Sequence, residues 1–279
     1  MITAAQQDYI DDHAYVPEHV LHYVAAISPT EPFLFGDFLA YVKKGHLIFI
    51  SYPLEETFEE ERLTSVLENA IKRFKPESVS LTAPSIPPSI NDSVHPLSDH
   101  YYRLDLAALS ISQKLRNMIH RAGRELSVGK KRTFGEEHTK IVEGFFKSHP
   151  VDEGTRTILE RIGEYLKAST TAWVFEAREP RGGLVAFDVA EFGPKDYVFY
   201  MFNFRSEALY VPGASDLLLY EIMQQAKTER KRFANLGLGI DSGVSFFKKK
   251  WGGRVFLSYA FCLYYPSKKE NVEALLRKL

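Results

Sequence analysis

The sequence predicts an α+β protein in which mainly antiparallel, mixed sheets are flanked by helices. Residues 172–177, 183–192 and 197–204 alternate like three consecutive strands, and short turns rich in glycine and proline separate them. A sheet-then-helix order occurs in both halves of the chain. Because 279 residues suffice for two compact units, we expect an N-terminal domain at residues 1–110 and a C-terminal domain at 111–279.

The composition is that of a globular protein without bulk affinity for polyanions. Apolar residues make up 45% of the chain, and the formal net charge is −1. A single cysteine, Cys262, excludes a disulfide framework and any multi-cysteine metal site. No apolar run has the length that a membrane-spanning helix needs. We therefore expect a cytoplasmic protein with no transmembrane segment, no metal and no tightly bound cofactor.

The first half reads as helix, hairpin, helix and strand. Residues 3–28 predict a helical opening, and two apolar segments at 33–42 and 46–51 predict a hairpin. Helical spacing at 57–74 ends before Pro76, and a short buried strand follows at 79–82. The proline-rich residues 83–96 predict a loop, and residues 101–106 alternate like a strand.

A basic segment opens the second half. Ser112 begins a predicted amphipathic helix, and the cations of this segment are Lys114, Arg116, Arg121, Arg124, Lys130, Lys131 and Arg132. One interpretation is a solvated helix that leads into a flexible basic loop. The other is contact with a polyanionic substrate, and this makes residues 112–132 the candidate site for tRNA.

Two helices are predicted at 136–147 and 155–167, and the three-strand meander follows them. The residues after the meander are the best candidates for a chemically functional site. A helix at 216–231 joins the meander to a buried strand at 233–238, so that this strand is free to lie parallel to its predecessor and splay the sheet. A short basic helix at 242–250 and a strand at 255–265 complete the chain.

A glycine-containing turn immediately precedes the helix at 216–231. Its residues are Val211, Pro212, Gly213, Ala214 and Ser215. Unpaired backbone N–H groups at a helix start attract phosphate. The plainer interpretation is a surface turn, with few packing neighbours around Gly213, and a helix that Ser215 caps.

Three motifs carry a resemblance to a known family. They are PGASDLL at 212–218, NLGLG at 235–239 and FFKKKWGG at 246–253. Together with the order of elements, they resemble the GNAT acyltransferase superfamily. The sequences of these motifs are similar to those in phosphatidylglycerol lysyltransferase C-terminal domains and Fem-type peptidyltransferases. Those proteins carry two such folds in tandem. The motifs are clear only after residue 171.

The resemblance implies a transferase that moves an acyl or aminoacyl group from an activated donor to an amine or hydroxyl acceptor. It places the donor, acyl-CoA or aminoacyl-tRNA, at Val211, Gly213, Ala214 and Ser215. The usual Arg/Gln-x-x-Gly-x-Gly/Ala loop for CoA is missing here. The alternative is a non-catalytic ligand-binding or assembly module with the same fold. The acceptor, a small molecule or a lipid-like one, stays open.

Candidate residues follow from these roles. Asn203 would orient the acceptor, and Asp188 or Glu191 would serve as general base. Tyr210 or Tyr264 would return a proton to the leaving group. Candidate substrate contacts are Arg116, Arg121, Arg124, Ser242 and Lys248. Each has a structural alternative: one or both of Asp188 and Glu191 would simply face solvent as ordinary strand residues, and Asp241 to Gly243 first suggests a helix cap.

Overall fold

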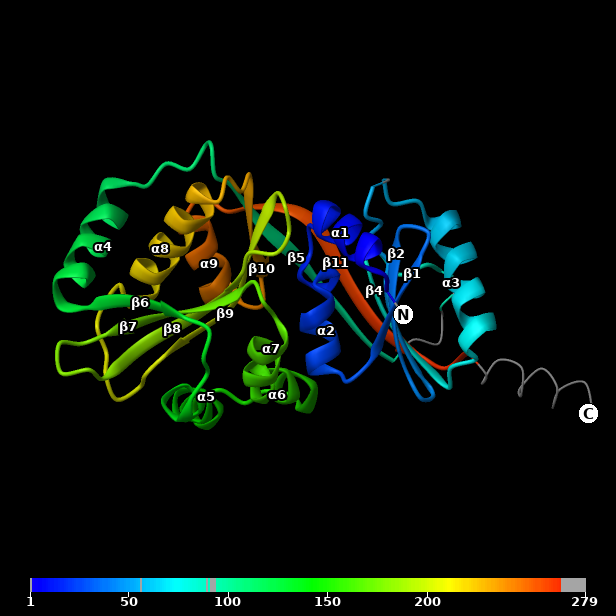
Figure 1. Cartoon of the computed structure of the whole chain (residues 1–279), viewed down its shortest axis with the longest axis horizontal. Helices are drawn as coiled ribbons and strands as arrows, with labels where there is room; N and C mark the ends of the chain where they lie inside the picture. The colour runs from blue at the N-terminus through cyan, green and yellow to red at the C-terminus, as the bar shows by residue number, and fades with distance from the viewer. Residues whose placement is uncertain (1, 56, 89, 91–93, 267–279) are drawn as a thin grey trace, which may run out of the picture.

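The computed structural model describes residues 2–55, 57–88, 90 and 94–266. Within them, one sheet of eleven strands runs through the molecule in the order β1-β2-β3-β4-β11-β5-β10-β9-β8-β7-β6 (Figure 1). The strands of the first half are β1 (Glu31–Phe35), β2 (Phe38–Lys43), β3 (His46–Ile50), β4 (Ser78–Ala83) and β5 (Val94–Asp105). Those of the second half are β6 (Ser127–Lys131), β7 (Ala172–Arg178), β8 (Leu184–Glu191), β9 (Tyr197–Arg205), β10 (Phe233–Leu238) and β11 (Arg254–Tyr264).

Each half contains one pair of parallel strands joined by a helix. In the first half, α3 (Glu60–Phe74) joins β3 to β4, and in the second half, α8 (Ala214–Thr228) joins β9 to β10. The meander β7-β8-β9 is antiparallel, as predicted. The parallel pairing of β9 with β10 is also confirmed.

Helices cover both faces of the sheet. In the second half, α8 packs on one face together with α4 (Gln113–Glu125) and α9 (Ser242–Lys250). The opposite face is covered by α5 (Glu136–Ser148), α6 (Glu153–Glu160) and α7 (Ile162–Ala168). In the first half, α3 lies on one face, and the other face is covered by α1 (Ala4–His13), the 3-10 helix η1 (Pro17–His19) and α2 (Leu21–Ile27). Figure 1 shows this arrangement as two groups of helices around one twisted sheet.

The long strands β5 and β11 join the two halves. β11 pairs with β5 over most of its length and with β4 on its other side. A strand from the end of the chain is thus inserted into the sheet of the first half. We keep residues 1–110 and 111–279 as a proposed division of the chain, with β11 crossing between the two parts.

Two local predictions were wrong. The apolar segment 33–42 is not one strand but a hairpin, because Gly36 adopts a positive φ of 61° and turns the chain between β1 and β2. The basic residues after α4 do not form a flexible loop. Lys130 and Lys131 lie in the edge strand β6, which pairs with β7 and is anchored by the 2.5 Å ion pair of Lys131 with the buried carboxylate of Glu176. Arg132 follows the strand and donates to the carbonyl oxygen of Ser169.

Candidate functional site

The two parallel strands of the second half separate after three residue pairs. β9 and β10 pair at Tyr197–Phe233, Val198–Ala234 and Phe199–Asn235. Beyond this point β9 bulges, because Tyr200 and Phe202 pair with consecutive residues of β8 and leave Met201 out of register. Gly237 in β10 has a φ of 77°, in the region that favours glycine. The strands therefore open a gap toward their C-terminal ends.

A lysine side chain reaches into this gap. The Nζ of Lys248 lies 3.7 Å from the point that a Cβ on Gly237 would occupy, and the carbonyl oxygen of Tyr200 lies 3.9 Å from the same point. Lys248 is 4% exposed and donates a hydrogen bond to the carbonyl oxygen of Leu238. Burial lowers its pKa to about 7, although the negative charges of Asp99 and Asp241 act to raise it. The prediction that its ammonium group lies partly outward on a basic helix was wrong, because α9 lies with this side against the gap.

The N-terminus of α8 lies beside the gap. The N-cap residue is Gly213, with a φ of 86°, and it offers no side chain for capping. Within the described residues, the backbone N–H groups of Gly213, Ser215 and Asp216 donate no hydrogen bond. These three groups and the helix dipole make the turn a place where an anion is favoured.

Two expectations about this turn were wrong. Ser215 does not cap α8, since it lies within the first turn and its hydroxyl donates to Oδ1 of Asn203 at 3.4 Å. Gly213 is not a surface residue with few neighbours. A Cβ at this position would lie 2.8 Å from Cγ of Met118 and 3.2 Å from its carbonyl oxygen, because α4 packs directly on the turn.

A chain of polar groups leads from this turn into the core. Nδ2 of Asn203, an exposed residue, donates to Oδ1 of Asp188 at 2.5 Å. Asp188 is fully buried, and burial raises its pKa to about 8, although the hydrogen bond from Asn203 favours the charged form. Asp188 is thus mostly protonated at neutral pH. The structure brings together Asp188, Asn203 and Ser215, but only the last two reach the surface.

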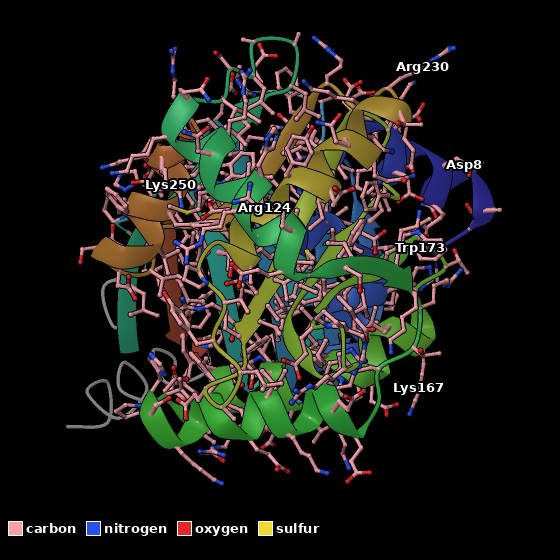
Figure 2. The ribbon with its side chains drawn as sticks, turned by 90° about the vertical axis from the view of Figure 1, so that its left-hand side faces the viewer. Asp8, Arg124, Lys167, Trp173, Arg230 and Lys250 are labelled. Carbon is pink, nitrogen blue, oxygen red and sulfur yellow. The ribbon has the colours of Figure 1, made fainter. Side chains whose placement is uncertain are left out.

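The basic residues of α4 lie on its outer face. Arg116, Arg121 and Arg124 are exposed, while the inner face of the helix packs on α8. Arg121 pairs with Glu125 at 3.5 Å. Arg124 lies in the middle of the face shown in Figure 2, between Lys250 of α9 and Trp173 of β7. A cationic surface thus adjoins the helix whose turn holds Gly213.

The remaining predicted residues lie elsewhere or have other contacts. Glu191 is fully buried and accepts hydrogen bonds from Tyr165, Ser169 and the backbone of Gly193, so it does not join Asp188. Tyr210 is 68% exposed. Ser242 is the exposed first residue of α9, and Asp241 caps this helix as predicted. Val211 and Ala214 lie in the turn itself.

Two supporting contacts were missed by sequence reasoning. Asp216, in the first turn of α8, accepts from Lys250 and from the indole N–H of Trp251, and so joins α8 to α9. Asp99 of β5 accepts from the N–H groups of Gly239 and Ile240 at 3.1 and 2.8 Å. It holds Ile240, a β-branched residue, at a φ of 60°, at the end of β10. For the contact of Asp216 with Lys250 and Trp251, the only indication in the sequence was the motif at 246–253 that contains both of these residues.

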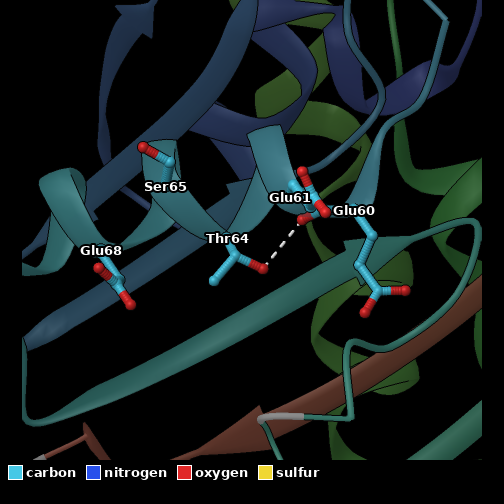
Figure 3. A pocket seen from close by; sticks show the side chains of 5 residues that line it. All are labelled: Glu60, Glu61, Thr64, Ser65 and Glu68. Carbon is cyan, nitrogen blue, oxygen red and sulfur yellow. Dashed lines mark hydrogen bonds between the residues drawn. The ribbon is translucent and has the colours of Figure 1, made fainter.

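A separate hollow of about 360 Å³ lies on α3. Figure 3 shows Glu60, Glu61 and Glu68 around it, with the hydroxyl of Thr64 donating to the carbonyl oxygen of Glu60 at 2.9 Å. Its lining comes from a single helix, and three carboxylates repel phosphate. The hollow therefore does not suit a phosphate-bearing donor.

Comparisons with known proteins identify the fold. No protein-family model matches the sequence, and no curated protein matches it significantly. Among solved structures, L-PGS from Bacillus licheniformis is similar with a TM-score of 0.59 at 14% identity, covering 95% of this chain and 92% of that one. FemX has a TM-score of 0.62 at 10% identity, with 93% and 96% covered. A tandem GNAT protein from the clavulanic acid biosynthesis pathway has a TM-score of 0.51 at 10% identity, with 82% and 78% covered.

The chain therefore has a tandem GNAT-like α+β fold, as the resemblance implied. At these identities the likeness concerns the fold alone. In the part of the chain that the structure describes, no helix combines the length and the apolar character needed to cross a bilayer.

Proposed function

We propose that this protein is a transferase that moves an aminoacyl group from tRNA to an amine or hydroxyl acceptor. The observation that carries the proposal is the gap between β9 and β10, which holds the buried amine of Lys248 and lies beside the unpaired N–H groups of the α8 turn. Structures named L-PGS and FemX have the same fold and support a transferase. Since aminoacyl-tRNA is a cytoplasmic donor, we place the reaction in the cytoplasm.

Three observations favour aminoacyl-tRNA over acyl-CoA as the donor. The glycine-rich CoA consensus is missing, and α4 packs on Gly213, so that less of the turn is open to a pyrophosphate. The outer face of α4, the helix that packs on the turn at Gly213, carries Arg116, Arg121 and Arg124. A row of exposed cations suits the backbone of a nucleic acid, whose binding is driven by counterion release.

With aminoacyl-tRNA as donor, the reaction transfers the aminoacyl group from an ester. The acceptor nitrogen or oxygen attacks the ester carbonyl carbon and forms a new bond to it. The bond from that carbon to the ribose oxygen of the tRNA breaks, and the acceptor's proton ends on this oxygen. The negative charge that develops on the carbonyl oxygen is the species to be stabilised in the transition state.

We assign the stabilisation of this negative charge to Lys248. Its ammonium form would donate to the oxyanion within the gap, where low solvent access strengthens the interaction. A pKa of about 7 leaves both protonation states populated at neutral pH, so the same amine is suited to move a proton. Asn203 would orient the acceptor at the surface, and the protonated Asp188 behind it would hold the amide in place.

One observation favours the alternative, a binding module without catalysis. Asp188 is sealed from solvent, and Glu191 is fully occupied by Tyr165, Ser169 and Gly193. Neither carboxylate can contact an acceptor directly. A non-catalytic member of the fold would bind a donor in the same gap and release it unchanged.

The substitution Ser215→Glu tests the donor site. A glutamate in the first turn stabilises a helix, but it would place negative charge next to the N–H groups of the turn. We expect aminoacyl-tRNA to bind the unmodified protein and to bind Ser215→Glu at least tenfold more weakly, with unchanged thermal stability. Ser65→Glu on α3 is the matched control and should bind normally. Equal binding by all three proteins would place the donor elsewhere, and turnover of bound donor with an added amine separates transferase from binding module.

A further inference from the structure

A hollow of about 240 Å³ lies between the edge strand β6 and α8, and we call it the β6–α8 hollow. On the side of the sheet it is lined by Lys130 of β6 and Phe175 of β7. On the side of α8 it is lined by four polar residues, Glu221, Gln224, Gln225 and Thr228. Sites for drug-sized ligands measure about 300–1,000 Å³. This hollow therefore suits a smaller unit, such as one ring of a polymer.

The wall on α8 offers hydrogen-bonding groups that the fold does not use. Its four residues follow the spacing i, i+3, i+4 and i+7, so they share one face of the helix. Among the contacts of the described residues, the side chains of Glu221 and Gln224 have no hydrogen bond and no ion pair. A carboxylate accepts hydrogen bonds, and an amide both donates and accepts. Together with the apolar ring of Phe175, these groups suit a flat heterocyclic ring with polar edges.

Cations lie on the strand side of the hollow. Nζ of Lys130 is 4.3 Å from the centroid of the Trp173 ring, and the guanidinium carbon of Arg132 is 5.7 Å from a ring of the same side chain. Lys130 is exposed, and within the described part of the chain no carboxylate pairs with it. The aromatic ring thus positions an ammonium group that is open to a phosphate. A ring in the hollow and a phosphate on Lys130 together correspond to a nucleotide.

The outer face of α4 connects this hollow to the α8 turn. Met118, in the middle of α4, lies against Gly213, and α4 ends just before β6 begins. Arg121 and Arg124 follow Met118 on the helix and are exposed, so they lie between the turn and β6. Figure 2 shows Arg124 and Trp173 on the same face of the molecule. The cations of α4 and β6 therefore form one continuous basic surface.

The length of α8 sets the distance between the turn and the hollow. At 1.5 Å per residue, Ser215 and Gln224 are separated along the helix axis by about 14 Å. A single strand of about four stacked nucleotides covers this distance. One strand can therefore reach both the hollow and the turn while its phosphates contact the arginines of α4.

We propose that the β6–α8 hollow binds one unpaired nucleobase that carries an exocyclic amino group, with the phosphate of that nucleotide on Lys130. Glu221 accepts a hydrogen bond from the amino group, a pairing that glutamate makes with N4 of cytosine. Uracil presents a carbonyl oxygen at the same place, and the carboxylate repels it. The assignment of the base to a tRNA donor rests on the proposed function, but the binding of a nucleotide does not.

An extended peptide added to the free edge of β6 is the alternative occupant. An edge strand has unpaired backbone groups that can pair with another strand, but lysine on such an edge opposes the pairing. β6 carries two lysines, Lys130 and Lys131. A strand added in the plane of the sheet would also leave the polar wall on α8 unused. The lining of the hollow therefore favours a nucleobase.

Binding of cytidine monophosphate, with uridine monophosphate as its match, tests the proposal. Ligand-observed NMR titration of the full chain at pH 7 gives both dissociation constants. We expect cytidine monophosphate to bind at least about fivefold more tightly, because only cytosine donates to Glu221 at this position. Glu221→Gln should reduce the preference to less than about twofold, since an amide accepts from cytosine and donates to uracil. Lys130→Met should weaken binding of cytidine monophosphate several-fold and leave binding of cytidine, which has no phosphate, nearly unchanged.

Controls separate this site from the donor site. Glu68→Gln on α3 and Lys140→Met on α5 make the same exchanges at exposed positions and should bind like the unmodified protein. Ser215→Glu should also bind cytidine monophosphate normally, so this site can stand even if the donor site fails. Conversely, binding of aminoacyl-tRNA without any preference for cytidine monophosphate would refute this site alone.

Three results overturn the proposal. The first is absent or equal binding of the two nucleotides by the unmodified protein. The second is an unchanged preference in Glu221→Gln. The third is binding of an oligoglutamate peptide in place of cytidine monophosphate, which would make β6 a site for strand addition.

Discussion

The β3-α3-β4 unit of the first half and the β9-α8-β10 unit of the second half share one connectivity but differ in how far their strands stay paired. β3 and β4 pair over five residues from His46–Ser78 to Ile50–Thr82, and Ser51 continues the ladder with a hydrogen bond to Thr82. β9 and β10 pair over three residues and then separate. Only the second of these two units opens a gap between its parallel strands.

The two helices also begin in different electrostatic surroundings. α3 starts with Glu60 and Glu61, which occupy the positive end of its dipole. α8 starts at Gly213 with unpaired N–H groups, and the acidic residue of its first turn, Asp216, is neutralised by Lys250. The comparison teaches that a repeated fold does not repeat a site. Strand separation and the charge at the helix start decide which copy can hold an anionic donor.

The largest effect is expected from packing at the α8 turn. Gly213 and Gly36 both have positive φ, but a Cβ meets Met118 only at Gly213, whereas nothing lies within 4 Å at Gly36. We expect Gly213→Ala to cost about 3 kcal/mol of unfolding free energy, from backbone strain and overpacking, and Gly36→Ala about 1 kcal/mol from strain alone. Urea unfolding measures both. Equal costs would show that α4 does not press on this turn.

The basic face of α4 should distinguish the two units in tRNA binding. Reversing the charges of Arg116, Arg121 and Arg124 should weaken tRNA binding by about a hundredfold at low salt, because phosphate contacts become repulsive. Changing Glu60, Glu61 and Glu68 of α3 to glutamine should leave it nearly unchanged. Filter binding at several salt concentrations provides the measurement. No tRNA binding by the unmodified protein at low salt would remove the main support for an aminoacyl-tRNA donor.

The sealed Asp188 predicts a pH dependence of stability. Its pKa is raised from 3.8 to about 8 in the folded protein, so the folded state binds more protons between these values and stability falls as pH rises through this window. Asp188→Asn cannot ionise and should gain about 2 kcal/mol relative to the unmodified protein between pH 5 and 8. Chemical unfolding across this range measures the gain. A constant difference between the two proteins would mean that Asp188 ionises freely.

Lys248 predicts the opposite slope with a smaller effect. Its pKa is lowered from 10.5 to about 7, so the unfolded state binds more protons between these values and stability rises with pH there. Lys248→Met should be more stable by about 1 kcal/mol at pH 6, and this advantage should disappear by about pH 10. Melting temperatures at pH 6, 8 and 10 provide the comparison. A variant that is less stable at every pH would show that the hydrogen bond to Leu238 outweighs burial of the amine.

Much of this fold could be predicted because its signals are local. The alternation of β7, β8 and β9, the cap of α4 at Ser112 and the parallel β10 all follow from short-range patterns. The contact of Met118 with Gly213 could not be predicted, since it joins two elements far apart in the chain.

The candidate site was predicted less completely than the fold. Lys248 belongs to a run of three lysines, and only the position of Leu238 shows which of them is buried. Asp188 and Glu191, three residues apart on one strand, were expected to be equivalent, but this spacing already puts them on opposite faces. The hydrogen bond from the hydroxyl of Tyr101 to Glu18 gave no signal at all, because the two residues are far apart in the chain.

Hydrogen exchange in the presence of donor tests the central claim, that the second unit alone holds the donor, most directly. Exchange rates of backbone amides would be compared with and without aminoacyl-tRNA, and with uncharged tRNA as control, in peptides covering residues 200–205, 211–217 and 60–65. The gap between β9 and β10 and the α8 turn should become protected, while the start of α3 should exchange at its original rate. Protection at 60–65 without protection at 200–205 and 211–217 would contradict the account.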